Sequence, residues 1–138
     1  MPILSSDDQI RKALRESRIV AVLGASSNPA RAGYYVTKVV QRYGFRIIPV
    51  NPNHMGELIL GERVYRTLDE IPGPVGIVDV FRRPSAASTV AMQVRSKGCK
   101  TVWFQPGCEN YQIAEELGRE GFQVVLGRCM MVECRRLL

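Results

Sequence analysis

The chain has 138 residues, of which 46% are hydrophobic and 23% are charged, a composition typical of one soluble globular domain. No apolar run approaches the roughly 20 residues of a membrane span, and the first residues lack the apolar segment of a secretory signal. We therefore expect one cytoplasmic domain over residues 1–138. The formal net charge of +6 suits a phosphorylated cofactor or a nucleic acid as partner, or serves solubility alone.

Helical and strand patterns alternate along the sequence. Ser6 and Gln9 fit a capping box for a helix that ends near Ser17. Further helices are expected at about 34–43, 84–97 and 111–120, with a brief helix at 67–71, whereas 128–138 shows no clear period. Apolar runs predict five strands, at Ile19–Leu23, Arg46–Val50, Val75–Phe81, Thr101–Phe104 and Phe122–Leu126.

This alternation indicates a parallel sheet that is covered by helices on both faces. We predict a single α/β domain of Rossmann-like fold, with a five-stranded, mostly parallel sheet in the order 3-2-1-4-5. Its ligand crevice is expected at the carboxyl ends of the first and third strands, at the switch point of the sheet. The apolar tail from Met130 to Leu138 is compatible with a homodimer.

The first strand leads into a loop with a distinctive composition, in the segment IVAVLGASSNPARAG. An apolar strand ends at Gly24, a loop of small residues follows, and a helix begins near Tyr34. Such a strand–loop–helix unit directs backbone N–H groups and the positive helix end at one point, where a phosphate binds. The loop is not the G-x-G-x-x-G of dinucleotide dehydrogenases, because the next glycine is Gly33.

The end of the second strand also disfavours a dinucleotide. NAD-binding folds carry an Asp or Glu here for the ribose hydroxyls, whereas this chain has Asn51 followed by Pro52 and no nearby acid. An arginine for the 2′-phosphate of NADP is also missing directly after this strand.

The other strand ends carry small, amide or cationic residues. Arg82 and Arg83 follow the third strand, and we expect one of them to bind an anion. Arg31 and Lys38 lie near the helix start, where each can meet a phosphate or only solvent. The strand ends bring together no histidine, carboxylate or Ser–His pair for acid–base or nucleophilic chemistry. The crevice is therefore expected to bind a ligand, and we predict no catalytic residue.

The cysteines and the single histidine give no metal-binding pattern. Cys99, Cys108, Cys129 and Cys134 have irregular spacings without C-x-x-C, unlike structural zinc sites. His54 lies in a polar connector and is interpreted as solvated. We predict no metal site.

Six segments in this order resemble the small bacterial and archaeal CoA-binding proteins, which correspond to the CoA-binding domain of the succinyl-CoA synthetase α-subunit. These segments are GASSNPARAGYYV, RIIPVNPN, LGERVYRTLDEIP, VDVFRRP, VWFQPG and GFQVVLGRCMMVE, and together they span about Ile19 to Arg136. The resemblance implies a Rossmann-like fold that holds coenzyme A or an acyl-CoA across the carboxyl ends of the strands.

The resemblance also implies the residues of the site. The glycine loop would contact a CoA phosphate, with two further cationic partners; Asn51 and Pro52 would flank the nucleotide end. The opposite lip would be 81–84, and the pantetheine path would pass the fourth strand end. The complete set is Gly24, Ala25, Ser26, Asn28, Arg31, Lys38, Asn51, Pro52, Phe81, Arg82, Arg83, Pro84, Gln105 and Gly107.

Family enzymes that ligate through CoA use a phosphorylated histidine in a second domain, so we expect no synthetase activity from this chain alone. The sequence departs from the family pattern at Cys108, where an aliphatic residue is expected, and at Cys134, where a histidine is expected. The thiol of Cys108 raises the hypothesis of a mixed disulfide with CoA. Two other functions stay open: an NAD(P)- or thiol-dependent oxidoreductase, and a nucleic-acid-binding module, which the scattered basic residues disfavour.

Overall fold

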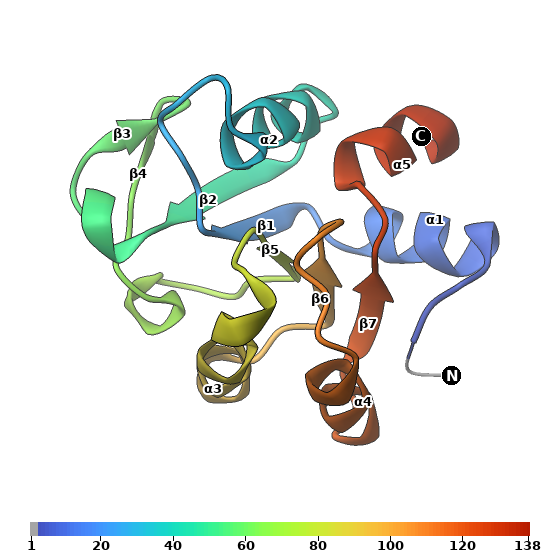
Figure 1. Cartoon of the computed structure of the whole chain (residues 1–138). Helices are drawn as coiled ribbons and strands as arrows, with labels where there is room; N and C mark the ends of the chain where they lie inside the picture. Colours follow the sequence, from blue (N-terminus) through green and yellow to red (C-terminus); the bar gives the residue numbers. More distant parts are fainter. Residues whose placement is uncertain (1–2) are drawn as a thin grey trace.

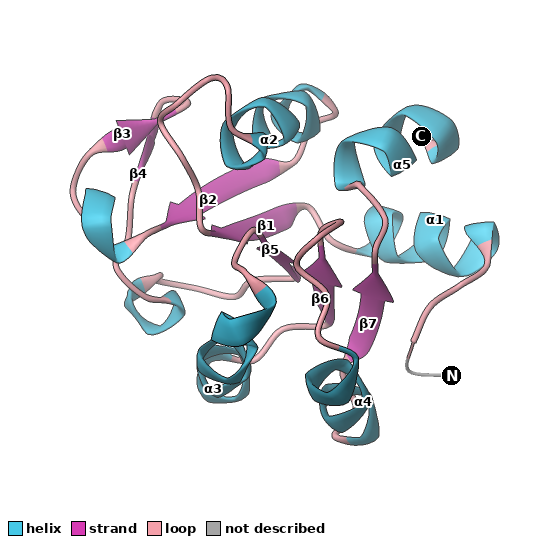
Figure 2. Cartoon of the chain, in the orientation of Figure 1, coloured by secondary structure: helices cyan, strands magenta, loops and turns pink. Residues whose placement is uncertain are grey.

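Five parallel strands form the central sheet of the computed structural model, which describes residues 3–138 (Figures 1 and 2). Residues 1 and 2 of the predicted domain lie outside the described residues. The sheet order is β2-β1-β5-β6-β7. The strands are β1 (Ile19–Leu23), β2 (Arg46–Val50), β5 (Ile77–Val80), β6 (Thr101–Phe104) and β7 (Gln123–Leu126).

Helices cover both faces of this sheet (Figure 1). One layer contains α1 (Asp7–Glu16), α2 (Ala32–Arg42) and α5 (Met130–Leu137), and the other contains α3 (Ala87–Lys97) and α4 (Tyr111–Arg119). Short 3₁₀ turns at Pro52–His54, Leu68–Glu70 and Pro84–Ala86 and a hairpin of β3 (Leu58–Ile59) and β4 (Glu62–Arg63) complete the chain. The α/β class, the parallel sheet and the two helical layers are as expected. No helix in 3–138 has the length and apolar character to cross a bilayer.

The position of one strand differs from the expected order 3-2-1-4-5. The third sheet strand along the chain, β5, pairs with β1, with Val20 opposite Ile77, which gives the other common doubly wound order, 2-1-3-4-5. The outer edge of β2 is bridged instead by Tyr65, whose N–H donates to Pro49 and whose carbonyl accepts from Asn51. The segment that follows β2 thus occupies the edge where the third strand was expected.

Strand residues are buried on alternate faces. Val20 and Val22 belong to the apolar cluster under α1, α2 and α5, whereas Ala21 and Leu23 belong to the cluster that faces α3 and α4. This explains why the strands read as nearly continuous apolar runs, since both faces of each strand are covered.

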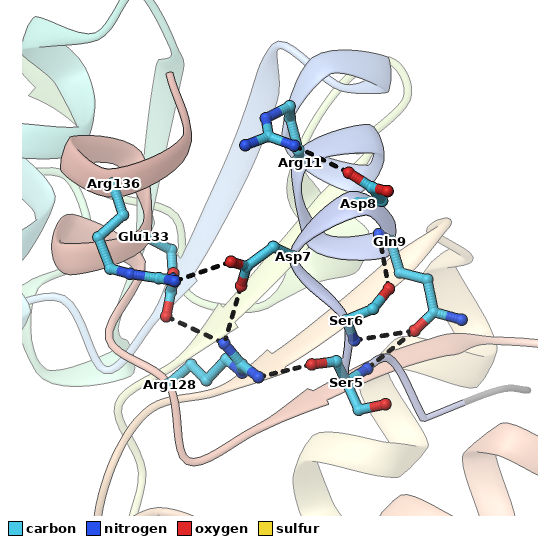
Figure 3. Close-up of polar contacts among 9 residues, drawn as sticks. All are labelled: Ser5, Ser6, Asp7, Asp8, Gln9, Arg11, Arg128, Glu133 and Arg136. Atoms are coloured by element: carbon cyan, nitrogen blue, oxygen red, sulfur yellow. Dashed lines mark hydrogen bonds and ion pairs between the residues drawn. The ribbon is translucent and has the colours of Figure 1, made fainter.

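The sequence pattern does not predict the C-terminal helix α5, because residues 128–138 show no clear period. Its buried residues Met130, Cys134 and Leu137 recur at helical spacing. The buried carboxylate of Glu133 pairs with Arg128 at 3.4 Å and with Arg136, and Arg136 also contacts Asp7 of α1 at 2.9 Å (Figure 3). This network, together with the apolar contacts, fixes α5 against the start of α1.

Candidate functional site

A cavity of about 530 Å³ opens at the carboxyl ends of the strands, between the start of α2 and the segments that follow β5, β6 and β7. Residues from four separate segments line it, as expected at the switch point of a doubly wound sheet. They are Gly24, Ser26, Arg31, Ala32, Gly33, Tyr35, Val36, Phe81, Gln105, Pro106, Cys108, Cys129 and Met131.

Two glycines allow the backbone segments around this cavity to approach closely. Gly24 has a φ of +85°, and a Cβ there would lie 2.5 Å from the carbonyl oxygen of Phe81. A Cβ on Gly33 would lie 2.7 Å from the carbonyl oxygen of Gly24. The first turn of α2 therefore lies directly on the loop that follows β1.

The amino end of α2 faces this loop without a side-chain cap. The N-cap residue is Arg31, and its side chain makes no capping hydrogen bond. The first N–H groups of a helix have no intrahelical acceptor, and together with the helix dipole they suit an anion. Arg31 lies beside them on the cavity wall and adds a positive charge.

Polar side chains of the loop after β1 form hydrogen bonds with the backbone of the same loop. The hydroxyl of Ser26 accepts from the N–H of Asn28 at 3.0 Å, and the amide oxygen of Asn28 accepts from Ala30 at 3.0 Å. Asn51 donates to the carbonyl of Ala25 at 2.9 Å. Asn28 and Asn51 thus shape the loop, and of these polar side chains only Ser26 also lines the cavity.

Five of the fourteen expected site residues line the cavity: Gly24, Ser26, Arg31, Phe81 and Gln105. The other nine are found outside its wall. Ala25 is buried beneath the loop, and Lys38 is exposed on α2. The remainder, which lie in the connections after the strands, are Asn28, Asn51, Pro52, Arg82, Arg83, Pro84 and Gly107.

The two adjacent arginines after β5 make different contacts. The Cδ of Arg82 lies 3.2 Å from the position that a Cβ on Gly24 would take, so this side chain extends over the loop. The Nε of Arg83 donates to the hydroxyl of Ser85 at 2.8 Å. Arg82 is therefore the arginine nearer the glycine loop.

The sequence did not single out several wall residues. Tyr35 and Val36 come from the first two turns of α2, and Cys129 and Met131 come from the N-cap and the first turn of α5. The helix positions follow from the approach of α2 to the loop. Cys129 and Met131 reach the wall because residues 130–137 form α5, a helix that the sequence pattern does not predict.

A buried acid lies beneath the cavity. Asp79 is in the middle of β5 and is 1% exposed. Its Oδ1 accepts a hydrogen bond of 2.7 Å from Nε2 of Gln105. Burial raises the pKa of Asp79 to about 7, although the hydrogen bond from Gln105 acts in the opposite direction. Because this carboxyl lies within a strand and not past its end, the sequence pattern did not indicate it as a site residue.

Two thiols, those of Cys108 on the cavity wall and Cys134 in α5, have a raised pKa. Burial, with the charges of Glu109 and Asp79, raises the pKa of Cys108. Burial and the charge of Asp79 are the largest of the effects that raise the pKa of Cys134 to about 12. All four cysteines are free. Within residues 3–138, no group of three or more His, Cys, Asp or Glu side chains could hold a metal ion.

Comparison with known proteins assigns the fold and the loop to a family. The model of the CoA binding domain family matches residues 18–135, which include every wall residue of the cavity. This chain belongs to the CoA binding domain family.

Relatives of this CoA binding domain include both small proteins and parts of large ones. The protein YneT of Bacillus subtilis is 35% identical over 127 residues, which are 92% of this chain and 93% of YneT. The α-subunit of ADP-forming acetate–CoA ligase II of Pyrococcus furiosus is 33% identical over 62% of this chain, but this match covers 18% of that subunit. The chain thus corresponds to a small part of the ligase subunit.

A solved structure has the same fold over nearly the full length. A protein of Thermus thermophilus, described as cell-free ID.343, superposes with a TM-score of 0.93 and 36% identity. The match covers 97% of this chain and 100% of that structure. The sheet order and both helical layers are therefore shared with a protein of the same size.

Proposed function

We propose that this cytoplasmic protein binds coenzyme A or an acyl-CoA in the cavity at the carboxyl ends of the strands, and that it has no catalytic activity on its own. The observation that carries this proposal is the contact of Gly24 with Gly33, which places the uncapped amino end of α2 against the wall of a cavity of about 530 Å³. This arrangement occurs in a chain of the CoA binding domain family.

The phosphates of CoA would bind at the glycine loop. The N–H groups of the first turn of α2 offer uncharged donors, and the guanidinium of Arg31 offers a charge-assisted hydrogen bond. Arg82 and Arg83 would approach from the opposite lip. Asn51 and Pro52 would flank the nucleotide, and Lys38 would reach a phosphate only from the outer face of α2.

The pantetheine arm would run toward the ends of β6 and β7. The wall there is largely apolar, with Phe81, Pro106 and Met131 beside the amide of Gln105. An arm of methylene and amide groups suits such a surface, because its carbon atoms can be buried while its amides find a polar partner. Gly107 follows in the same turn.

The chemistry of the wall supports binding. Its polar side chains are the hydroxyls of Ser26 and Tyr35, the guanidinium of Arg31, the amide of Gln105 and the thiols of Cys108 and Cys129. A raised pKa keeps the Cys108 thiol a weak nucleophile near neutral pH. Asp79 lies below the wall and contacts it through Gln105.

Thermal unfolding of the reduced protein with CoA, acetyl-CoA, NAD, NADPH and ATP tests this proposal. A ligand present at about 100 times its Kd adds about 2.7 kcal/mol to the free energy of unfolding, which is a rise on the order of 5–10 °C for a domain of this size. We expect the rise with CoA or acetyl-CoA. A rise with NADPH and none with CoA would overturn the proposal in favour of an oxidoreductase. A salt-dependent shift of labelled RNA would favour the nucleic-acid alternative.

A further inference from the structure

The contact between Asp79 and Gln105 connects a buried acid with the polar group of the cavity wall. Gln105 lines the cavity, and its Nε2 is directed at Asp79 at 2.7 Å. The side-chain amide has one other polar atom, the carbonyl oxygen Oε1. Because Nε2 donates one of its two hydrogens to Asp79, Gln105 has the acceptor Oε1 and the second N–H left to offer to a ligand.

The protonation state of Asp79 controls this arrangement. An ionised carboxylate only accepts hydrogen bonds, so it must face the amide nitrogen of Gln105. A protonated carboxyl can also donate, and it can then bond to Oε1 of Gln105. In that state the amide can rotate by half a turn and direct its NH₂ group into the cavity.

We propose that Asp79 is a positioning residue whose proton sets the polarity of the Gln105 amide, and thereby selects between free CoA and acyl-CoA. The inference rests on the proposed CoA-binding function. With Asp79 ionised, the wall offers an acceptor, which suits the S–H donor that free CoA carries and an acyl-CoA lacks. With Asp79 protonated, the wall can offer a donor, which suits the carbonyl oxygen of a thioester.

The surroundings of Asp79 make it the group that titrates. Its register neighbours in β1 and β6 are Val22 and Trp103, and neither ionises. The titratable groups that its charge influences are the thiols of Cys108 in the loop after β6 and of Cys134 in α5. Both thiols have a raised pKa and keep their protons through neutral pH. The raised pKa of Asp79, about 7, places the switch between the two forms in that range.

Calorimetric titration with CoA and with acetyl-CoA at pH 6 and pH 8 tests this inference. We expect the ratio of the Kd of acetyl-CoA to the Kd of CoA to increase about three- to tenfold from pH 6 to pH 8, the effect of one hydrogen bond gained or lost. Asp79→Asn carries no ionisable proton, so its ratio should not change with pH. Gln105→Met should bind both ligands, and the ratio of its two Kd values should also be the same at pH 6 and pH 8.

Glu109→Gln is a matched control, because it makes the same change of carboxylate to amide in the loop after β6 and should keep the pH dependence of the parent protein. A ratio that is constant with pH in the parent protein, or that changes equally in Asp79→Asn, would overturn the inference while CoA binding stands. If neither ligand binds the parent protein at either pH, the proposed function itself fails.

Discussion

A methyl group on Gly33 would lie 2.7 Å from the carbonyl oxygen of Gly24, so the start of α2 and the loop after β1 are in backbone contact. Because the obstacle is a backbone atom, Gly33→Ala must move the helix away from the loop. Alanine usually stabilises a helix relative to glycine; here we expect a loss of about 1–3 kcal/mol, as for other overpacked sites. Urea unfolding without ligand measures this change.

The same substitution should weaken CoA binding more than it weakens the fold. A displaced α2 no longer directs its first N–H groups at the phosphate site, and we expect a Kd at least about tenfold higher. Calorimetry at a temperature where the variant is fully folded gives this value. An unchanged Kd would show that the amino end of α2 does not contact the ligand.

Arg31 should contribute a charge-dependent part of the affinity. Arg31→Ala removes a guanidinium from the cavity wall, and we expect a loss of about tenfold or more, typical of a hydrogen bond to a charged group. The salt dependence of the Kd should also become weaker. Arg42→Ala is the matched control, since Arg42 is exposed in the last turn of the same helix. Equal losses in the two variants would indicate only a general effect of net charge.

Asp79 should lower the stability of the folded protein as the pH rises. Its pKa is about 7 in the folded protein, against an ordinary value of 3.8 for an aspartate side chain, so between these values the folded form binds more protons than the unfolded form. The free energy of unfolding therefore falls with increasing pH. Through Asp79, the free energy of unfolding falls by about 4 kcal/mol between pH 4 and pH 8.

Asp79→Asn removes this contribution. We expect the variant to be close to the parent protein in stability at pH 4 and more stable by a few kcal/mol at pH 8. Urea unfolding at both pH values measures the difference, and Glu109→Gln serves again as the control. A variant that is less stable than the parent at pH 8 would show that the ionised carboxyl is held by favourable contacts.

The parts of the site that follow directly from parallel strands could be predicted from the sequence. Gly24, Ser26 and Gln105 lie just past the expected strand ends, and such positions meet at one edge of the sheet. Asp79 lies within a strand, and its direction toward the cavity depends on how β5 is placed beside β1 and β6. The outer edge of β2, where the third strand was expected, is bridged by Tyr65 at Val50, and no local pattern reveals this bridge.

The far wall of the cavity depends on tertiary contacts in the same way. Met131 lies at the start of α5, a helix of eight residues whose short apolar pattern is too brief to predict with periodicity. Its position is secured by Glu133, whose two arginine partners lie in the preceding connection and in α5 itself. Sequence spacing alone does not show that these groups meet Asp7 at the other end of the chain.

Loss of the Glu133 carboxylate should therefore loosen α5. The Glu133 side chain is 7% exposed, pairs with Arg128 at 3.4 Å and also contacts Arg136. Glu133→Gln leaves both guanidinium groups without this anion, and we expect the free energy of unfolding to fall by about 1–3 kcal/mol, since both arginines keep their contact with Asp7.

Glu115→Gln is the control for this change. Glu115 forms an exposed pair with Arg119 at 3.9 Å, and such a pair contributes at most about 0.5 kcal/mol. Because α5 carries Met131 at the cavity wall, Glu133→Gln should also weaken CoA binding, whereas Glu115→Gln should not. Urea unfolding and calorimetry of both variants separate the two effects. Equal stability of the two variants would mean that the apolar contacts of Met130 and Leu137 hold α5 without the ion pairs.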